Sequence, residues 1–333
     1  MKGRYQFRVK SKKVLFDFTI RRNITVIKGD SATGKTTLLH MLYEYLRVGR
    51  ESGYSVAADV KYFVYLRREV GRDWQDALLP LEHTVIFIEE NNNFVFSEEF
   101  AEFVRNSDNY FVLVNRSPFK MLPYSVHEIY EIVTHGQRAD MQESYHVLRE
   151  LYSNYPVIGN NQMRTVITED SNAGHQFFSH ILKGRKVYSA SGNGSIIGWL
   201  RNMAEGEVLV IADGAAFGAM MEECMELIQA QLPHRITMWL PESFECLILQ
   251  SGLVQAKDLT DILENTSDYV ESSQFESWER YYTELLTTLT EGTLYQYMKR
   301  SLNPCYLQEK NVKKIAAQFP EVIRALVTDC LIC

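Results

Sequence analysis

The sequence predicts an α/β protein with two α/β domains and a helical C-terminal segment. An apolar, β-branched run at Ile24–Ile27 leads through a loop with two glycines into a leucine-rich helical pattern. A second alternation of short apolar runs and helical patterns fills the C-terminal half, and an aromatic helical pattern ends the chain. We therefore expect domains at residues 1–150 and 160–258 and a helical cap at 259–333.

Length and composition are those of an ordinary folded protein. The chain has 333 residues, of which 46% are hydrophobic and 23% charged, so it can bury more than one core. Apolar runs stay well short of the roughly 18 residues that span a bilayer, and the polar start at Met1–Tyr5 is unlike a signal peptide. We expect a cytoplasmic protein with no membrane partner. Five cysteines predict no disulfide framework, and Cys330 and Cys333 are expected to be free thiols.

Charge is unevenly distributed along the chain. The net charge is −7, yet residues 1–50 contain twelve Lys or Arg and only three acidic residues. Such a basic lobe is suited to contact nucleic acid, a partner protein or the acidic part of another copy in a homo-oligomer. The alternative is that these lysines keep a strand edge from aggregating.

The first domain is expected to start with an antiparallel hairpin, because apolar residues alternate in Tyr5–Val9 and again in Phe16–Ile20. A helix should then run from Lys35 to about Gly49. The further elements expected there are strands at Ser55–Ala58, Lys61–Leu66, Thr84–Ile88, Tyr110–Val114 and Tyr130–Val133 and a helix at Trp74–Leu81.

The most specific motif is the stretch Gly29-Asp30-Ser31-Ala32-Thr33-Gly34-Lys35-Thr36, which fits G-x-x-x-x-G-K-[ST] at every fixed position. Glycines that adopt unusual dihedral angles let successive backbone N–H groups converge on a polyphosphate at the head of a helix. Lys35 is placed to meet the β- and γ-phosphates, and the Thr36 hydroxyl is placed to ligate Mg²⁺. The motif and Thr37 after it are therefore expected to bind ATP and Mg²⁺. The alternative is a strand-to-helix turn that binds nothing.

A second part of this site is expected at the end of Thr84–Ile88, where Glu89 and Glu90 follow a continuously apolar strand. The two motifs resemble Walker A and Walker B of the P-loop NTPases, and the strands before the loop resemble those of ABC and related ATPases. The resemblance implies that Glu89 holds the Mg²⁺ shell, in place of the usual Asp, and that Glu90 orients the attacking water. The alternative is an acidic pair that caps a helix.

The strand Tyr110–Val114 ends in Asn115 and Arg116, shortly before Pro118. Polar residues at this strand tip often sense the γ-phosphate in P-loop proteins, so Asn115 or Arg116 is a candidate for that role. A plain turn before Pro118 is the alternative. The span between Lys35 and Glu89 holds no LSGGQ-like signature, which excludes a transporter-type ABC protein.

Acidic residues also follow strands of the second domain. Glu169 and Asp170 come after an apolar run, and Asp213 comes after another. The strands expected are Arg164–Thr168, Lys186–Ala190, Glu207–Ala212 and Arg235–Leu240, with helices at Gly174–Leu182, Ile196–Met203 and Phe217–Gln231.

This arrangement resembles a TOPRIM domain, the metal-dependent module of topoisomerases, primases and the overcoming-lysogenisation-defect nucleases, which likewise couple it to an ATPase. The resemblance implies that Glu169, Asp170 and Asp213 hold Mg²⁺ for phosphodiester chemistry, with Glu242 or Glu245 as a candidate for a further carboxylate. Ala215 departs from the family's D-x-D pattern, because it replaces the second Asp and removes a metal ligand. The alternative is an unrelated α/β domain whose acids cap helices.

The end of the chain is expected to be helical at Ser277–Leu286 and Thr293–Arg300. A cap that packs on the second domain is the simplest interpretation. The alternative is a docking surface for a partner, on which Tyr295, Tyr297, Lys299 and Arg300 contact a nucleic-acid strand.

The sequence thus predicts an ATP-binding and ATP-hydrolysing protein. Its nucleotide state would control a TOPRIM-like, degenerate domain that acts on nucleic acid, and family analogy adds defence against mobile elements. A regulatory or scaffold protein with a non-catalytic second domain is the alternative, which Ala215 favours. A small-molecule kinase that uses Arg67, Arg68 and Arg72 is a third possibility.

Overall fold

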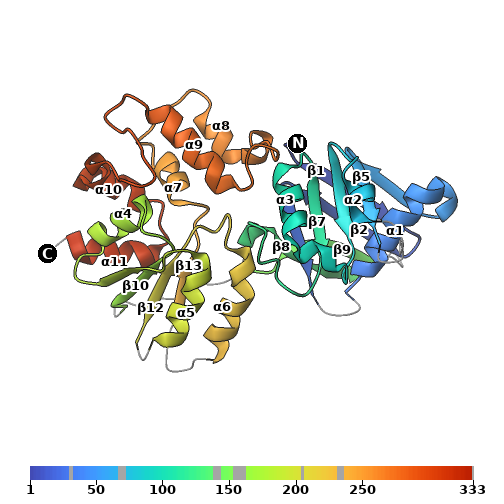
Figure 1. Cartoon of the computed structure of the whole chain (residues 1–333), viewed down its shortest axis with the longest axis horizontal. Helices are drawn as coiled ribbons and strands as arrows, with labels where there is room; N and C mark the ends of the chain where they lie inside the picture. The colour runs from blue at the N-terminus through green and yellow to red at the C-terminus, as the bar shows by residue number, and fades with distance from the viewer. Residues whose placement is uncertain are drawn as a thin grey trace. The chain divides into compact units, whose positions relative to one another are not determined.

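The computed structural model describes residues 1–29, 33–66, 73–137, 144–152, 163–203, 206–230 and 236–331. It is an α/β protein with one large mixed sheet and one parallel sheet (Figure 1). The chain divides into two compact units, which are described separately: unit 1 comprises Met1–Asn154 and Asn265–Ser277, and unit 2 comprises Tyr155–Glu264 and Trp278–Cys333. The segment from residue 259 onward, expected as one cap, is therefore shared between the two units.

Unit 1 is built on the mixed sheet, whose described strands lie in the order β4-β1-β2-β9-β8-β3-β7-β6-β5. These strands are β1 (Tyr5–Lys10), β2 (Val14–Ile20), β3 (Ile24–Lys28), β4 (Ser55–Ala58), β5 (Lys61–Tyr65), β6 (Thr84–Ile88), β7 (Tyr110–Val114), β8 (Ile129–Gln137) and β9 (Ser144–Glu150). β1 and β2 form the predicted antiparallel hairpin, with Phe7 opposite Phe18. β9 was not predicted, and it joins this hairpin to the parallel part of the sheet through β2 and β8.

The parallel part of this sheet positions the ends of the predicted motifs. β7 lies between β3 and β6 and runs parallel to both. β3, β6 and β7 are buried along their whole length, as expected of strands covered on both faces. The carboxyl ends of parallel strands meet at one edge of a sheet. The phosphate loop after β3, Glu90 after β6 and Arg116 after β7 are thereby brought together.

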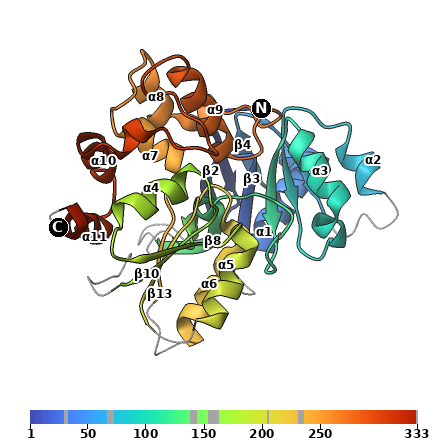
Figure 2. The ribbon, with the colours of Figure 1, turned by 60° about the vertical axis from the view of Figure 1, so that its left-hand side comes forward.

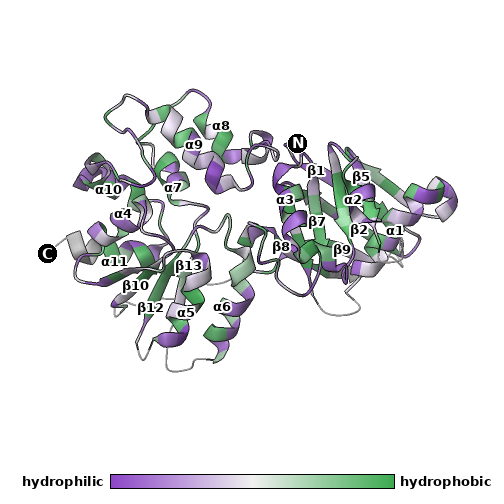
Figure 3. Ribbon diagram, in the orientation of Figure 1, coloured by the Kyte–Doolittle hydropathy of each residue, from purple (hydrophilic) through white to green (hydrophobic). Residues whose placement is uncertain are grey.

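Helices α1 (Lys35–Val48), α2 (Trp74–Leu78) and α3 (Glu98–Asn106) complete unit 1, with short 3₁₀ turns between elements. α3 begins at Ser97, whose hydroxyl accepts a hydrogen bond from the Phe100 N–H at 3.2 Å. The apolar face of α1, with Leu38 and Leu42, packs in a core with Phe7 of the hairpin. Hydrophobic colour accordingly marks the central strands in Figure 3.

A distant segment, Asn265–Ser277, completes unit 1. The Gly3 N–H donates to the Ser267 carbonyl at 2.6 Å, and the Ser272 N–H donates to the Met1 carbonyl at 3.0 Å. These contacts join residues far apart in the sequence, so no local pattern could predict them.

Unit 2 is built on a parallel sheet with the order β11-β10-β12-β13. Its strands are β10 (Thr165–Thr168), β11 (Lys186–Ser189), β12 (Val208–Ile211) and β13 (Ile236–Trp239), which confirms the predicted alternation. Its helices are α4 (Ala173–Ile181), α5 (Asn193–Asn202), α6 (Gly218–Ala230), α7 (Phe244–Gln250), α8 (Leu259–Glu264), α9 (Trp278–Thr290), α10 (Glu309–Ala316) and α11 (Glu321–Leu331). α5 and α6 lie side by side (Figure 2). The neighbours of β10 lie on opposite sides of it, so its carboxyl end opens into a crevice.

The helix predicted at Thr293–Arg300 is wrong, because this stretch consists of turns. Gly292 follows α9 with a φ of 67° and changes the chain direction. The Thr290 hydroxyl then accepts a hydrogen bond from the Tyr297 N–H at 2.9 Å, which draws Tyr297 into the core. The helical spacing of the aromatic residues reflected burial in a folded-back loop.

Within the described residues, no helix has both the length and the apolar character needed to cross a membrane. Cys224, Cys246 and Cys305 are buried free thiols. Cys333 and the side chain of Cys330, both predicted to be free thiols, lie outside what the structure describes, as do Arg67, Arg68 and Arg72.

Candidate functional site

The two glycines of the G-x-x-x-x-G-K-[ST] motif have the unusual dihedral angles that the sequence predicts for them. Gly29 has a φ of 118° and Gly34 a φ of 100°, conformations that residues with a Cβ rarely adopt. α1 begins directly after Gly34, so the loop meets the positive end of the helix dipole. Asp30, Ser31 and Ala32, which belong to the predicted site, lie outside the described residues.

Lys35 folds back over this loop. Its ammonium donates to the Gly29 carbonyl at 2.6 Å and to the Thr33 hydroxyl at 3.1 Å. The side chain is only 7% exposed. The positive charge therefore lies against Gly29 and Thr33, at the head of α1.

A cavity of about 480 Å³ lies beside the loop. Residues 33–37 line it together with Glu90, Arg116 and His146. Its size falls within the range of small-molecule pockets, about 300–1,000 Å³. The described part of the loop is therefore one wall of a space large enough for a small-molecule ligand.

The strand-end residues differ in whether they reach this cavity. Arg116 and Glu90 both line it, and Arg116 Nε lies 3.8 Å from Glu90 Oε2. Glu89 is not in the lining formed by the described residues, and its backbone N–H donates to the Tyr65 carbonyl at 3.0 Å. Asn115 forms the local turn, since its side-chain oxygen accepts from the Ser117 N–H at 3.1 Å. Of the two sensor candidates, only Arg116 lies in this lining.

An aromatic wall borders the cavity and was missed by sequence reasoning. The rings of Phe16 and His146 stack with centroids 4.8 Å apart and an interplanar angle of 24°. Burial lowers the pKa of His146, which favours the neutral ring. His146 reaches the loop only because β9 pairs with β2, and nothing in its local sequence indicates this.

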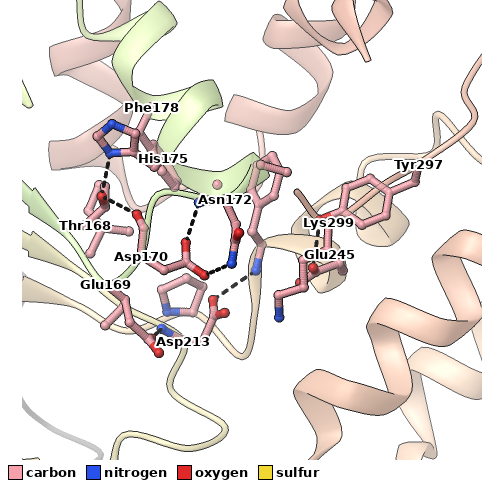
Figure 4. Close-up of a pocket in the computed structure, with 16 residues that line it drawn as sticks. Thr168, Glu169, Asp170, Asn172, His175, Phe178, Asp213, Glu245, Tyr297 and Lys299 are labelled. Atoms are coloured by element: carbon pink, nitrogen blue, oxygen red, sulfur yellow. Dashed lines mark hydrogen bonds between the residues drawn. The ribbon is translucent and has the colours of Figure 1, made fainter. Parts of the chain in front are cut away.

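A second, smaller cavity lies at the carboxyl ends of β10 and β12 in unit 2. Its volume is about 30 Å³, close to the share of liquid volume taken by one water molecule. Its charged and phenolic lining comprises Glu169, Asp170, Asp213, Glu245, Tyr297 and Lys299 (Figure 4). The space suits an ion or a water molecule and is too small for a nucleotide.

The three predicted metal ligands line this cavity, but each already accepts a backbone hydrogen bond. Glu169 Oε2 accepts from the Asp213 N–H at 3.0 Å, and Asp170 Oδ1 accepts from the Asn172 N–H at 3.0 Å. Asp213 Oδ1 accepts from the Phe244 N–H at 3.2 Å. Among the residues described here, no group of three or more acidic, His or Cys side chains is arranged to hold a metal ion.

Burial dominates the electrostatics of this cavity. It raises the pKa of Glu169 to about 7, against the hydrogen bond from the Asp213 backbone. Burial, together with Glu279 and Glu169, raises the pKa of Asp213 well above its usual value. A positive charge in this space acts against both shifts, because it favours the ionised carboxylates.

The loop after α9 supplies that charge. Lys299 Nζ forms an ion pair with Glu279. The Tyr297 hydroxyl donates to Glu245 Oε1 at 2.7 Å, and Tyr297 is only 1% exposed. The nucleic-acid contact predicted for Tyr297 is therefore wrong, since its ring is in the core.

Comparisons of the chain with protein-family models, with curated proteins and with solved structures found no match.

The cavity of unit 1 and the cavity of unit 2 differ in the groups that line them. The larger offers a glycine loop, an ammonium and a carboxylate to an anionic ligand, and the smaller encloses carboxylates around an ammonium of the chain itself.

Proposed function

We propose that the chain binds ATP with Mg²⁺ in the cavity of unit 1 and hydrolyses it, as a P-loop NTPase does. The observation that supports this most is the meeting of Lys35, Glu90 and Arg116 around one cavity, from the ends of three different strands. A strand-to-helix turn without a ligand would have no reason to gather these groups.

The loop supplies the binding. Backbone N–H groups in the first turn of α1 lack helical partners and favour an anion. On binding, the Lys35 ammonium would leave the Gly29 carbonyl and contact the phosphates. The loss of side-chain entropy would be small, because hydrogen bonds to Gly29 and Thr33 already hold the ammonium at the loop. Phe16 and His146 offer a stacked aromatic wall, of the kind on which nucleobases stack.

Oxygen donors that suit Mg²⁺ line the cavity at Thr36 and Glu90, so the residues present fit the ion. When bound, Mg²⁺ neutralises charge on the phosphates. Glu90 would orient the attacking water, and Arg116 would stabilise the charge of the transferred phosphoryl group. Glu89 remains a predicted contact to the Mg²⁺ shell.

The nucleotide state would in turn control unit 2, as in the ATPase–TOPRIM proteins that the sequence resembles, with nucleic acid as the target. A second candidate is a nucleotide-dependent scaffold whose unit 2 is not catalytic. Ala215 and the ammonium of Lys299 beside the acidic residues favour this version.

Phosphate release and ATP binding by the full chain test the proposal. We expect Lys35→Ala to weaken ATP binding by roughly tenfold to a hundredfold, since a charge-assisted hydrogen bond contributes about 1.5–3 kcal/mol. Glu90→Gln should keep binding and lower phosphate release by on the order of a hundredfold or more. Lys61→Ala, at the exposed first residue of β5, and Glu51→Gln, at an exposed residue, are matched controls.

Unchanged turnover in both variants would refute the assignment. Tight ATP binding by the wild-type protein without phosphate release, abolished by Lys35→Ala, would favour the scaffold.

A further inference from the structure

The TOPRIM resemblance implies a divalent metal at the ends of β10 and β12, and the donors there do not fit one. Ala215 stands where the family has a carboxylate, and its methyl group is buried. Asp170 is turned toward Asn172, which donates to both of its carboxylate oxygens. Glu169, Asp213 and Glu245 then remain in the lining. Each of them already accepts a hydrogen bond, and among the described residues no three acidic, His or Cys side chains are arranged to hold a metal ion.

The same space already holds a cation that belongs to the chain. Lys299 lines the cavity with Glu169, Asp213 and Glu245. Figure 4 shows Lys299 and Glu245 together on one side of Asp213, with Glu169 on the other. Burial alone would lower the pKa of Lys299, but the carboxylates of Glu245 and Glu279 outweigh it and raise the pKa. The ammonium is thus a permanent charge in this site.

The position of Lys299 is built into the fold. Its carbonyl accepts a hydrogen bond from the Ala173 N–H at 2.8 Å, at the start of α4. Two residues earlier, the hydroxyl of Tyr297 is tied to Glu245. One residue later, the Arg300 carbonyl accepts from Gln176 Nε2 at 3.0 Å. A surface lysine that met the acids by chance would not be fixed on both sides.

One atom in the site is left unsatisfied. Glu245 is 2% exposed, and its Oε2 has no hydrogen-bond partner among the described residues. A buried carboxylate oxygen without a partner is costly unless a positive charge lies near it. Lys299, which lines the same cavity, supplies that positive charge. Removing the Lys299 ammonium would leave carboxylates that another cation could stabilise.

We propose that Lys299 replaces the metal ion in unit 2, so that this TOPRIM-like site works without a divalent cation. The acidic residues then act as the partners of an internal ammonium, and metal-dependent phosphodiester cleavage is absent. This inference does not depend on nucleotide binding in unit 1.

Titration of the nucleotide-free full chain with Mn²⁺, followed by electron paramagnetic resonance, tests it. We expect Lys299→Met to bind about one more Mn²⁺ per chain than the wild type, because the emptied space is lined by carboxylates. Lys313→Met, which removes an exposed ammonium paired with Glu309, should leave the number unchanged. Asp213→Asn added to Lys299→Met should abolish the gain.

Two outcomes would overturn the proposal. One is a wild-type Mn²⁺ site that disappears in Asp213→Asn, which would show that the acids hold a metal beside Lys299. The other is a folded Lys299→Met protein that gains no site. The first comparison needs no Lys299 variant, so it decides the matter even if Lys299→Met does not fold.

Discussion

Substitution of Gly34 by Ala separates the phosphate-binding role of the loop from its role in folding. Gly34 has a φ of 100° and a ψ of −1°, and a residue with a Cβ in such a conformation costs about 1–3 kcal/mol. The added methyl group would lie 3.4 Å from the Phe16 ring, at the near limit of ordinary contact, so the strain comes mainly from the backbone and the loop can relieve it by shifting. We expect the free energy of unfolding to fall by about 1–3 kcal/mol.

Nucleotide binding should fall by more than this backbone cost explains. A shifted loop misdirects N–H groups, and each charge-assisted hydrogen bond lost removes about 1.5–3 kcal/mol, or roughly tenfold to a hundredfold in affinity. Gly53→Ala is the matched control, because Gly53 has a φ of 76° and open space around the added methyl. It should lose about 1–2 kcal/mol of stability and no ATP affinity.

Urea denaturation and a fluorescent-ATP titration measure the two effects. If Gly34→Ala binds ATP as tightly as Gly53→Ala does, the loop is only a turn, and the reasoning is refuted.

Two further predictions concern a group of charged residues in unit 1, at the ends of the strands away from the cavity. Its members are Arg21, Arg22, His127, Glu128 and Glu150. Glu128 is fully buried and accepts hydrogen bonds from Arg21 Nε at 2.8 Å and from the Thr25 hydroxyl at 3.2 Å. Glu128→Ala should lower the free energy of unfolding by about 3–5 kcal/mol, because it removes the carboxylate that lies 3.3 Å from the Nε of the buried Arg22. A loss in urea denaturation no larger than that of Glu102→Ala, on the exposed face of α3, would contradict this. The hydrogen bond with His127, together with Arg21, lowers the pKa of Glu150 in the folded protein. The ionised Glu150 therefore stabilises the fold above the pKa of the unfolded state, and this stabilisation is lost as the pH falls through the lower pKa of the folded state. Glu150→Gln should therefore make thermal stability less sensitive to pH below about 4.5, and identical pH profiles for the two proteins would argue against it.

The glycine conformations and the start of the helix after them could be predicted because the information for them is local. Gly29 and Gly34 adopt the dihedral angles expected from the motif, and α1 begins at Lys35 as predicted. The strands before and after it were predicted for the same reason, since period-two alternation and continuous apolar runs are properties of a few adjacent residues. Glu90 could be named as a site residue because it directly follows such a run.

Long-range pairing decided the rest of both sites. Sequence could not choose between Asn115 and Arg116, and the insertion of β7 between β3 and β6 places Arg116 at the cavity. His146 lies at the cavity because β9 pairs with β2, which places His146 beside Phe16. Each of these neighbours is far away in the chain, and strand order leaves no trace in local composition.

The sequence by itself determined that this chain has two glycines just before a helix, acidic strand ends, and Ala215 two residues after Asp213. Only the tertiary structure decided that Lys299 lies among the acids and that Tyr297 is buried beside Glu245. The physical reason is that a lysine in a loop is equally compatible with solvent and with a buried ion pair. The fold decides between them by fixing the backbone of Lys299 on α4.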